Sequence, residues 1–559
     1  MSCQKKAFIF FLLVLCLPSL FGQEVRVKKS GISYDFRTLQ DEAADHDFDV
    51  LHYYFDWTMD HGNRYIQGLA VIRSRSLTDA LDSISLHLDR AMTVSDVRQE
   101  RISVPFLHTG DQLSISLAQT YRTGEEFEVA INYQGHPRDG LDFSSHRGQP
   151  IIWSLDEPIG ARSWFPCWDL PDDKATAEIR ITVPRNMLAA SNGTLIGSEM
   201  NGDDTVTYVW QELYPISTYL IFVAATNYVT FSDTYHAETK SMEVTHFVYP
   251  EHLNQAREDF SVTVPQIAFF SRVFGEYPFL EEKYRMAAIP GRTSMEHQTC
   301  TSYSEQAVTG THQYDWLIAH ELAHQWWGDL VTLADWSDIW LNEGFATYSD
   351  ALWQEYLYGF EGLKARVASF KEWYFQSHGG TGNPPEHPIH DPPEGHLFCD
   401  IEYEKAACVL HMLRFVVGDE AFWSILKKYA KDFAYANAAT EDFRKVCESV
   451  SGNDLRWFFD QWIYEAGYPV YQFGWGYTGH SRVRVVINQI QEDFPLFRMP
   501  VELRFALPSG AAKRIAHVDR EKNIFEFTFP ERPADVQLDP DGWILCEQEP
   551  FVKKSRRRR

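Results

Sequence analysis

The 559-residue chain lacks several features that would assign it to common functional classes. Basic residues are scarce, with 51 Lys and Arg against 78 Asp and Glu, and the net charge of −27 argues against nucleic acid as a partner. No glycine-rich phosphate-binding loop is present. Beyond the N-terminal segment, no run reaches the roughly 18 apolar residues that a transmembrane helix requires.

Cysteine is also sparse, and the spacing of the cysteines argues against only one kind of site. Because no C-x-x-C pair occurs, a zinc site built from cysteines is not expected. Several cysteines lie in apolar runs, which favours buried free thiols over disulfides, although the sequence does not determine pairing. Six cysteines follow residue 22: Cys167, Cys300, Cys399, Cys408, Cys447 and Cys546.

The N-terminus has the pattern of a secretory signal. Lys5 and Lys6 supply a positive start, and Ala7 to Leu17 form an apolar core too short for a membrane span. We expect cleavage near residue 22 and an exported protein, located in the periplasm, in the medium or on the cell surface. Lipidation at Cys16 is disfavoured because a bulky leucine precedes it.

The remaining length is enough for about three or four domains, and 44% hydrophobic residues can fill their cores. Residues 47–235 contain short alternating segments, which predict a large antiparallel β domain. Helical spacing then dominates up to Glu465, interrupted by a Pro-, Gly- and His-rich loop from His378 to His396. The irregular spacing of those histidines favours a solvated loop over a second metal site.

Strand patterns return after Gly467 and predict a small β-sandwich. The chain then ends in the basic segment Lys553 to Arg559. A solvated tail is the favoured interpretation of that segment, and weak contact with an anionic surface is the alternative.

The segment HELAHQWWG, from His320 to Gly328, carries the strongest chemical signal. On a helix from Leu317 to Trp327, two histidines four residues apart share a face and can bind one metal ion, with Glu321 directed toward a water molecule on that ion. Glu343, nineteen positions after His324, supplies a carboxylate in WLNEGFATY. Two histidines and one carboxylate leave a fourth position open, which is the pattern of a catalytic zinc site.

These motifs resemble those of the aminopeptidase N family of zinc exopeptidases. HELAHQWWG with WLNEGFATY is similar to the family's zinc signature, and YEKAACVLHML, from Tyr403, to its tyrosine segment. Further similarity lies in ARSWFPCWDLPDDKATAEIRITVP, VFGEYPF and GNDLRWFFDQWIYEAGYPV. The resemblance extends from Asp47 to Cys546, nearly the whole chain after the signal.

The resemblance implies a multidomain α+β protein. Many relatives end in a large helical domain that covers the active site, and no residues remain here for one, so we expect no large C-terminal helical domain and a more open cleft than in such relatives. The expected segments are a signal peptide (1–22), an N-terminal extension (23–46), an N-terminal antiparallel β domain (47–240), a thermolysin-like, mostly helical zinc catalytic domain (241–467), a C-terminal β-sandwich (468–548) and a basic tail (549–559).

The resemblance also implies the role of each site residue. One zinc ion is held by His320, His324 and Glu343, while Glu321 acts as general base and then general acid. Tyr403 is the implied donor to the oxyanion. Glu296, with Met295, is implied to bind the free N-terminus of a peptide substrate. Each zinc histidine should also donate a hydrogen bond from its second ring nitrogen to a carboxylate or a backbone carbonyl; Asp329 and Asp350 lie near in sequence, and the sequence does not choose between them.

Two departures from the family pattern affect the substrate site. The family's Gly-x-Met-Glu-Asn loop is here Thr293 to His297, which keeps Met-Glu and loses the flanking glycine and asparagine. A substrate-binding glutamine expected six residues before Ala161 is here Leu155, so we expect this amino-group contact to be missing or supplied by another residue.

Two other functions remain open at this point. A thermolysin-like endopeptidase would share the metal site but not the selection of the amino terminus, and the presence of Glu296 disfavours it. A non-catalytic, peptidase-like binding module is disfavoured because the chain has the metal ligands, Glu321 and Tyr403 together.

Overall fold

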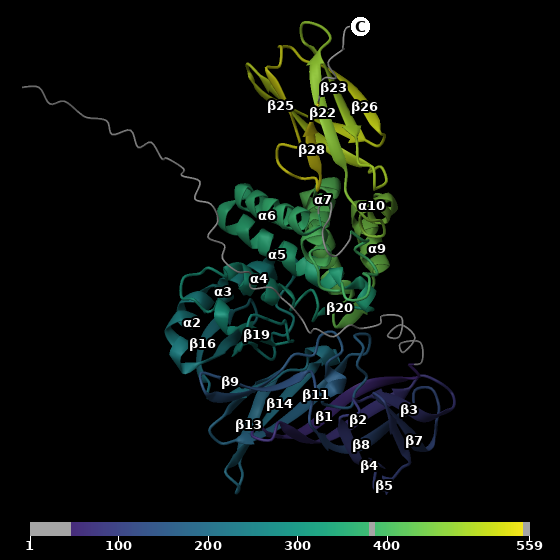
Figure 1. The fold of residues 1–559 in the computed structure, drawn as a ribbon, viewed down its shortest axis with the longest axis vertical. Helices are drawn as coiled ribbons and strands as arrows, with labels where there is room; N and C mark the ends of the chain where they lie inside the picture. The colour runs from purple at the N-terminus through teal and green to yellow at the C-terminus, as the bar shows by residue number, and fades with distance from the viewer. Residues whose placement is uncertain (1–45, 379–385, 552–559) are drawn as a thin grey trace, which may run out of the picture.

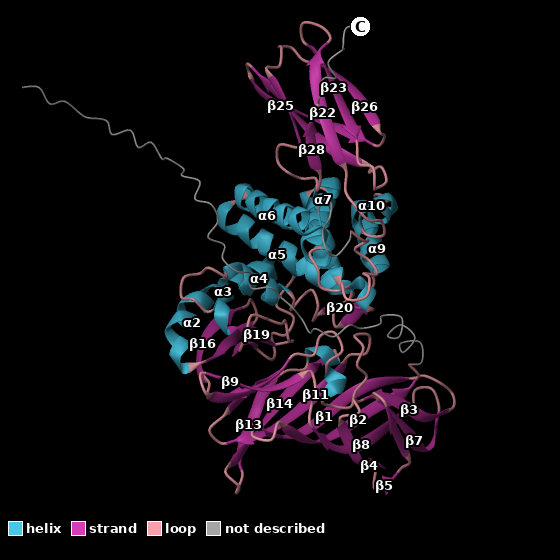
Figure 2. Ribbon diagram, in the orientation of Figure 1, coloured by secondary structure: helices cyan, strands magenta, loops and turns pink. Residues whose placement is uncertain are grey.

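The computed structural model describes residues 46–378 and 386–551. The predicted signal peptide, nearly all of the predicted extension and the basic tail from residue 552 onward lie outside these described residues. Sheets form one end of the molecule, helices form the middle, and a second set of sheets forms the opposite end (Figures 1 and 2). Within the described ranges, no helix combines the length and apolarity needed to cross a membrane.

The N-terminal end is built on an eight-stranded sheet in the order β13-β14-β11-β1-β2-β8-β4-β5. Its pairings are antiparallel except that β1 runs parallel to β11. Residues alternate between buried and partly exposed along β11, as expected for a strand with one face on a core. The strands are β1 (Phe48–Asp60), β2 (Tyr65–Ser76), β4 (Met92–Gln99), β5 (Ile102–Ser103), β8 (Glu126–Gly135), β11 (Ala175–Pro184), β13 (Thr194–Met200) and β14 (Thr205–Ile216).

Two smaller sheets complete this N-terminal part, in the orders β3-β7-β6 and β12-β15-β10-β9. In the second of these sheets, β10 is followed by the loop at residues 155–160 and then by a short 3-10 helix. The strands are β3 (Leu81–His87), β6 (Phe106–Thr109), β7 (Gln112–Tyr121), β9 (Leu141–His146), β10 (Gln149–Ser154), β12 (Leu188–Ser191) and β15 (Val223–Thr226). The short 3-10 helices here are η1 (Ala161–Ser163) and η2 (Thr218–Leu220).

The middle part combines a four-stranded sheet, ordered β16-β17-β18-β19, with helices and the parallel pair β20 and β21. Its strands are β16 (Val229–His236), β17 (Ser241–Val248), β18 (Tyr284–Ile289), β19 (Cys300–Ser304), β20 (Val331–Leu333) and β21 (Ala436–Ala438). Its helices are α2 (Leu253–Asp259), α3 (Thr263–Phe274), α4 (Asp315–Ala323), α5 (Trp340–Tyr358), α6 (Phe360–His378), α7 (Ala406–Val417), α8 (Asp419–Asp432), α9 (Thr440–Ser451) and α10 (Arg456–Trp462). Its short helical turns are η3 (Pro250–His252), η4 (Phe260–Val262), η5 (Glu305–Ala307), η6 (Trp336–Asp338) and the π-helix η7 (Ile401–Lys405).

The junction between the first two parts differs in detail from the sequence pattern. Residues 218–231, TYLIFVAATNYVTF, are one of the alternating segments predicted as strands in the range 47–235, but they divide into η2, β15 and the start of β16. Strand β16 pairs with β17, and its Phe231 and Tyr235 pack with the helices of the middle part. The predicted boundary at residue 240 therefore falls between two strands of one sheet.

The C-terminal part contains a four-stranded sheet, ordered β26-β23-β22-β28, and a three-stranded sheet, ordered β25-β24-β27. From α10 to residue 551, every described element is a strand, in agreement with the predicted small β-sandwich. The strands are β22 (Val470–Tyr477), β23 (Arg482–Gln489), β24 (Met499–Leu507), β25 (Gly510–Val518), β26 (Lys522–Thr528), β27 (Asp535–Leu538) and β28 (Glu547–Pro550).

Buried apolar residues form two large clusters. One fills the N-terminal sheets and extends to Met295, Trp336 and Ile339 of the middle part. The other fills the helical part and continues into the C-terminal sandwich. The loop that contains Met295 therefore lies where the N-terminal and middle parts meet.

Candidate metal centre

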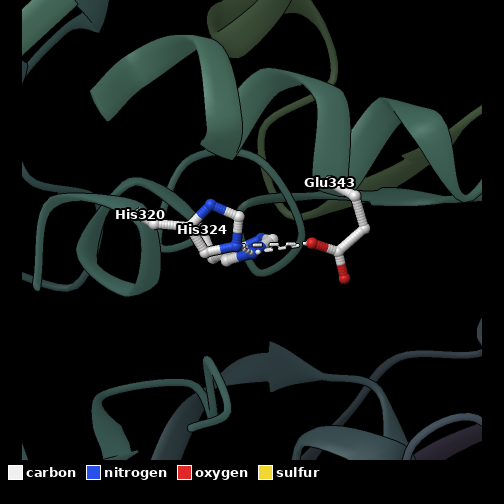
Figure 3. Close-up of side chains that lie close together, drawn as sticks. All are labelled: His320, His324 and Glu343. Carbon is white, nitrogen blue, oxygen red and sulfur yellow. Dashed lines mark hydrogen bonds and ion pairs between the residues drawn. The ribbon is translucent and has the colours of Figure 1, made fainter. Parts of the chain in front are cut away.

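Three predicted metal ligands come together in the middle part of the molecule. His320 lies in α4, His324 caps the end of that helix, and Glu343 lies in the first turn of α5. The Nε2 atoms of the two histidines are 3.2 Å apart, and each is 3.4 Å from Oε2 of Glu343 (Figure 3). Three donor atoms this close can bind a single ion.

The local turn after α4 orients His324. The regular helix ends at Ala323 rather than at Trp327, and the chain then folds back. The Nδ1–H of His324 donates to the carbonyl of Trp327 at 2.9 Å, which leaves Nε2 directed at the other ligands. Gly328 has a φ of +137°, and a Cβ there would lie 3.3 Å from Nδ1 of His324, so this turn requires glycine.

Neither aspartate proposed to support a zinc histidine makes that hydrogen bond to His324. Asp350 accepts two 2.7 Å hydrogen bonds from Arg366, and Asp329 accepts one from Gln325. The carbonyl of Trp327 takes the supporting role, which is the carbonyl alternative that the sequence left open. Sequence spacing could not show this, because any backbone carbonyl in the turn was a possible partner.

The charges around the centre suit a cation. Burial lowers the pKa of His320, with Glu343 acting in the opposite direction. Burial alone would also lower the pKa of His324, but Glu296 and Glu343 outweigh it and raise that pKa to about 10. Buried carboxylates therefore stabilise positive charge here. The donor set of two imidazoles and one carboxylate fits Zn²⁺.

Glu321 and Glu296 lie beside the ligands. Their carboxylates and a ring nitrogen of His324 are all within 4.8 Å of one another. The structure thus places the predicted base and the predicted amine-binding residue at the same centre, although they lie in α4 and in a loop after β18.

A further carboxylate, which sequence reasoning missed, belongs to Glu157. Oxygens of Glu157, Glu296 and Glu343 lie within 4.8 Å of one another, and Glu157 is 2% exposed. Glu157 lies two residues after Leu155, the position at which the family's glutamine is absent and for which a contact from another residue is one of the two expectations. The sequence does place two acidic residues, Asp156 and Glu157, between β10 and the Ala161 segment, but it does not show which of them reaches the centre.

The loop from Thr293 to His297 is fixed by backbone hydrogen bonds before Glu296 and by a ring contact after it. The backbone of Met295 exchanges hydrogen bonds of 3.0 and 2.9 Å with Ser302, and the Met295 side chain is fully buried in the N-terminal core. The ring of His297 stacks on Phe222 at 4.3 Å. Met295 and His297 therefore hold the loop in place on either side of Glu296. Contact between Met295 and the substrate stays a prediction.

Gln325, which lies inside the zinc motif, joins this loop to α4. Its Nε2 donates to the carbonyl of Glu296 at 3.1 Å and to Asp329 at 2.6 Å. Its Oε1 accepts from the backbone of Thr299 at 3.0 Å and from the hydroxyl of Tyr277 at 3.1 Å. Gln325 therefore fixes the backbone of Glu296 relative to the histidine ligands.

Tyr403 lies in the π-helix η7, and its ring is parallel to that of His320 with 6.2 Å between centroids. Burial, and then the charges of Glu343 and Glu296, raise the pKa of Tyr403 well above its usual value, so its hydroxyl keeps its proton. Gly344 permits this arrangement, because a Cβ there would lie 2.6 Å from the Cβ of Ala406. The close packing of α5 on α7 thus brings Glu343 and Tyr403 together.

Comparisons with known proteins agree with this geometry. The peptidase M1 N-terminal domain model matches residues 50–220, and the peptidase family M1 domain model matches residues 258–462. Probable aminopeptidase 1 of Sulfurisphaera tokodaii is 26% identical over 523 residues, covering 88% of this chain and 62% of the relative. Aminopeptidase M1 of Arabidopsis thaliana is 32% identical over 339 residues, covering 56% of this chain and 37% of the relative. The chain thus matches less than two thirds of the length of these relatives.

Solved structures show the same architecture. The M1 zinc metallopeptidase of Deinococcus radiodurans has a TM-score of 0.65 and 26% identity, covering 75% of this chain and 95% of that chain. Legionella pneumophila aminopeptidase A, solved with aspartic acid, has a TM-score of 0.79 and 20% identity, covering 91% of this chain and 61% of that chain. The second similarity concerns the fold alone.

Proposed function

Because the chain belongs to peptidase family M1, we propose that it is a zinc-dependent aminopeptidase that hydrolyses the N-terminal residue from peptides. The main observation in support is that carboxylate oxygens of Glu157 and Glu296 lie within 4.8 Å of the metal ligand Glu343. A mutant of the D. radiodurans protein was solved with a Tyr-Ser-Ala substrate, which supports peptides as the substrate class.

His320, His324 and Glu343 would hold the ion. When bound there, zinc polarises the scissile carbonyl and lowers the pKa of a water molecule toward about 7. Glu321, whose carboxylate lies within 4.8 Å of His324, accepts the proton of the attacking water and passes it to the leaving amine. The hydroxyl of Tyr403 donates to the oxygen that becomes negative as the carbonyl is attacked.

The acidic pair explains selection of the peptide end. Glu157 and Glu296 are 2% and 1% exposed, and both face the centre through short distances to Glu343. A substrate α-ammonium placed among these carboxylates makes charge-assisted hydrogen bonds, which fix the first peptide bond at the metal. An acetylated N-terminus carries no charge and leaves the carboxylates without that partner.

One comparison tests this function against an endopeptidase. The hydrolysis rates of an aminoacyl anilide with a free amino group and of its N-acetyl form should differ strongly in favour of the free amine. Equal rates would contradict the exopeptidase assignment. Activity before and after chelation, with zinc added back, tests the non-catalytic alternative, which requires no turnover in any sample.

We also propose that the protein is exported. The support is the N-terminal pattern of Lys5 and Lys6 followed by the apolar core from Ala7 to Leu17. N-terminal sequencing of protein recovered from separated cell fractions tests this. A mature chain that begins after residue 22 outside the cytoplasm is expected, whereas an intact Met1 on cytoplasmic protein would contradict the proposal.

A further inference from the structure

A second group of metal-binding side chains lies next to η7. His387, Cys399 and Glu402 each offer one ligand atom, and these three atoms lie within 4.8 Å of one another. His387 is 5% exposed and Glu402 is fully buried, while Cys399 is partly buried. The sequence pattern had favoured a solvated loop here, but the fold buries this histidine.

The three side chains are oriented toward one another. The Nδ1–H of His387 donates to the carbonyl of Pro388 at 2.8 Å, which leaves Nε2 with a lone pair, 3.6 Å from Sγ of Cys399. Sγ lies 3.0 Å from Oε2 of Glu402. In the described part of the chain, Oε1 of this buried Glu402 accepts no hydrogen bond.

These distances suit a tetrahedral ion. Zinc–sulfur and zinc–nitrogen bonds of about 2.3 and 2.0–2.1 Å place the two ligand atoms about 3.5 Å apart at a tetrahedral angle. The observed separation of 3.6 Å agrees. The 3.0 Å separation of sulfur and oxygen is shorter, and it corresponds to the thiol hydrogen bond that a metal would replace.

We propose that His387, Cys399 and Glu402 form a second Zn²⁺ site, separate from the catalytic centre. The ion replaces the thiol proton of Cys399, which is released to solvent, and binds the thiolate, the carboxylate of Glu402 and the neutral imidazole of His387. The two negative ligands balance the charge of the ion. A thiolate with an imidazole selects zinc over magnesium or calcium.

The ammonium group of Lys405, three residues after Glu402, forms its ion pair with another carboxylate. The nearby Lys405 is fully buried and forms an ion pair with Glu386 at 2.5 Å.

The site would link the loop before η7 to the turn that carries Tyr403. Glu402 precedes Tyr403 directly, and both lie in the π-helix. Cys399 is further joined to this turn by the hydrogen bond from its backbone N–H to Glu402. An ion held here therefore stabilises the conformation of η7.

Zinc counting on purified, full-length protein tests the proposal. After dialysis against a small molar excess of Zn²⁺, the wild type should hold two ions per chain by plasma mass spectrometry. Cys399→Ser and Glu343→Gln should each hold one ion, and the double variant should hold none. A wild-type content of one ion that is unchanged in Cys399→Ser would overturn the proposal.

Cobalt provides an independent readout. Loading with Co²⁺ should produce a thiolate-to-cobalt charge-transfer band in the near ultraviolet that persists in Glu343→Gln and disappears in Cys399→Ser. Cys408→Ser, a change at a buried cysteine in α7, is the matched control and should keep the band.

Serine at residue 399 preserves a hydrogen-bond donor to Glu402, and circular dichroism verifies that this variant is folded. Absence of a thiolate band in the wild type would refute the proposed ligand set. Because neither readout uses turnover, failure here is distinguishable from failure of the proposed aminopeptidase function.

Discussion

Replacement of Glu157 by glutamine is the most informative change to the candidate amine site. The substitution preserves size and keeps a hydrogen-bond acceptor, but it removes one of the carboxylate charges that lie within 4.8 Å of one another. Glu296 and Glu343 remain. The variant therefore isolates the charge that Glu157 contributes to binding a substrate ammonium.

The expected magnitude follows from the type of bond. A hydrogen bond to a charged group contributes about 1.5–3 kcal/mol, and each 1.4 kcal/mol changes a rate or equilibrium constant about tenfold. We expect kcat/KM for a free-amino anilide to fall by about 10- to 150-fold. Because the other carboxylates still attract the ammonium, the loss should not exceed this range greatly.

Steady-state kinetics on matched substrates provides the assay. The residual rate on the N-acetyl anilide should be unchanged, since that substrate has no ammonium for Glu157 to bind. Glu199→Gln, on the exposed strand β13, is the charge-matched control and should behave as wild type. An equal loss on both substrates, or no loss on the free amine, would refute the assigned role of Glu157.

Three further predictions concern the proposed chemistry and its support. Glu321→Gln should keep its zinc and lose about 10²- to 10⁴-fold in kcat, and unchanged turnover with zinc bound would exclude this residue as the base. Tyr403→Phe should lower kcat by about 10²- to 10³-fold with little change in KM, since only the transition state loses a donor; a change confined to KM would contradict this. Lys174 donates to the carbonyls of Asp329 and Leu330, and burial lowers its pKa from 10.5 to about 7. Between pH 7 and pH 10.5 this lysine therefore binds more protons in the unfolded chain than in the folded protein. Its contribution makes the free energy of unfolding rise with pH over that range. The free energy of unfolding in urea should therefore increase for the wild type relative to Lys174→Met between about pH 7 and pH 9. A difference between the two proteins that does not change with pH would contradict this prediction.

Much of the architecture could be predicted from local pattern. Alternation identified strands such as β8 and β23, because each has one buried face and the period-two pattern is visible in the residues themselves. The stretch at residues 218–231 could not be resolved in the same way. Its residues are nearly all buried on both faces, so periodicity did not reveal the breaks among η2, β15 and β16.

The sequence by itself identified the metal motif, because a spacing of four residues puts His320 and the helix-capping His324 on one side of α4. It could not determine Glu157, because the position of that side chain beside Glu296 and Glu343 depends on how the N-terminal sheets pack on the helical part. The same holds for the Gln325 contacts with the loop, which join segments far apart in the chain. Spacing along a helix is fixed by covalent geometry and backbone hydrogen bonds, whereas proximity between separate elements is decided only by tertiary packing.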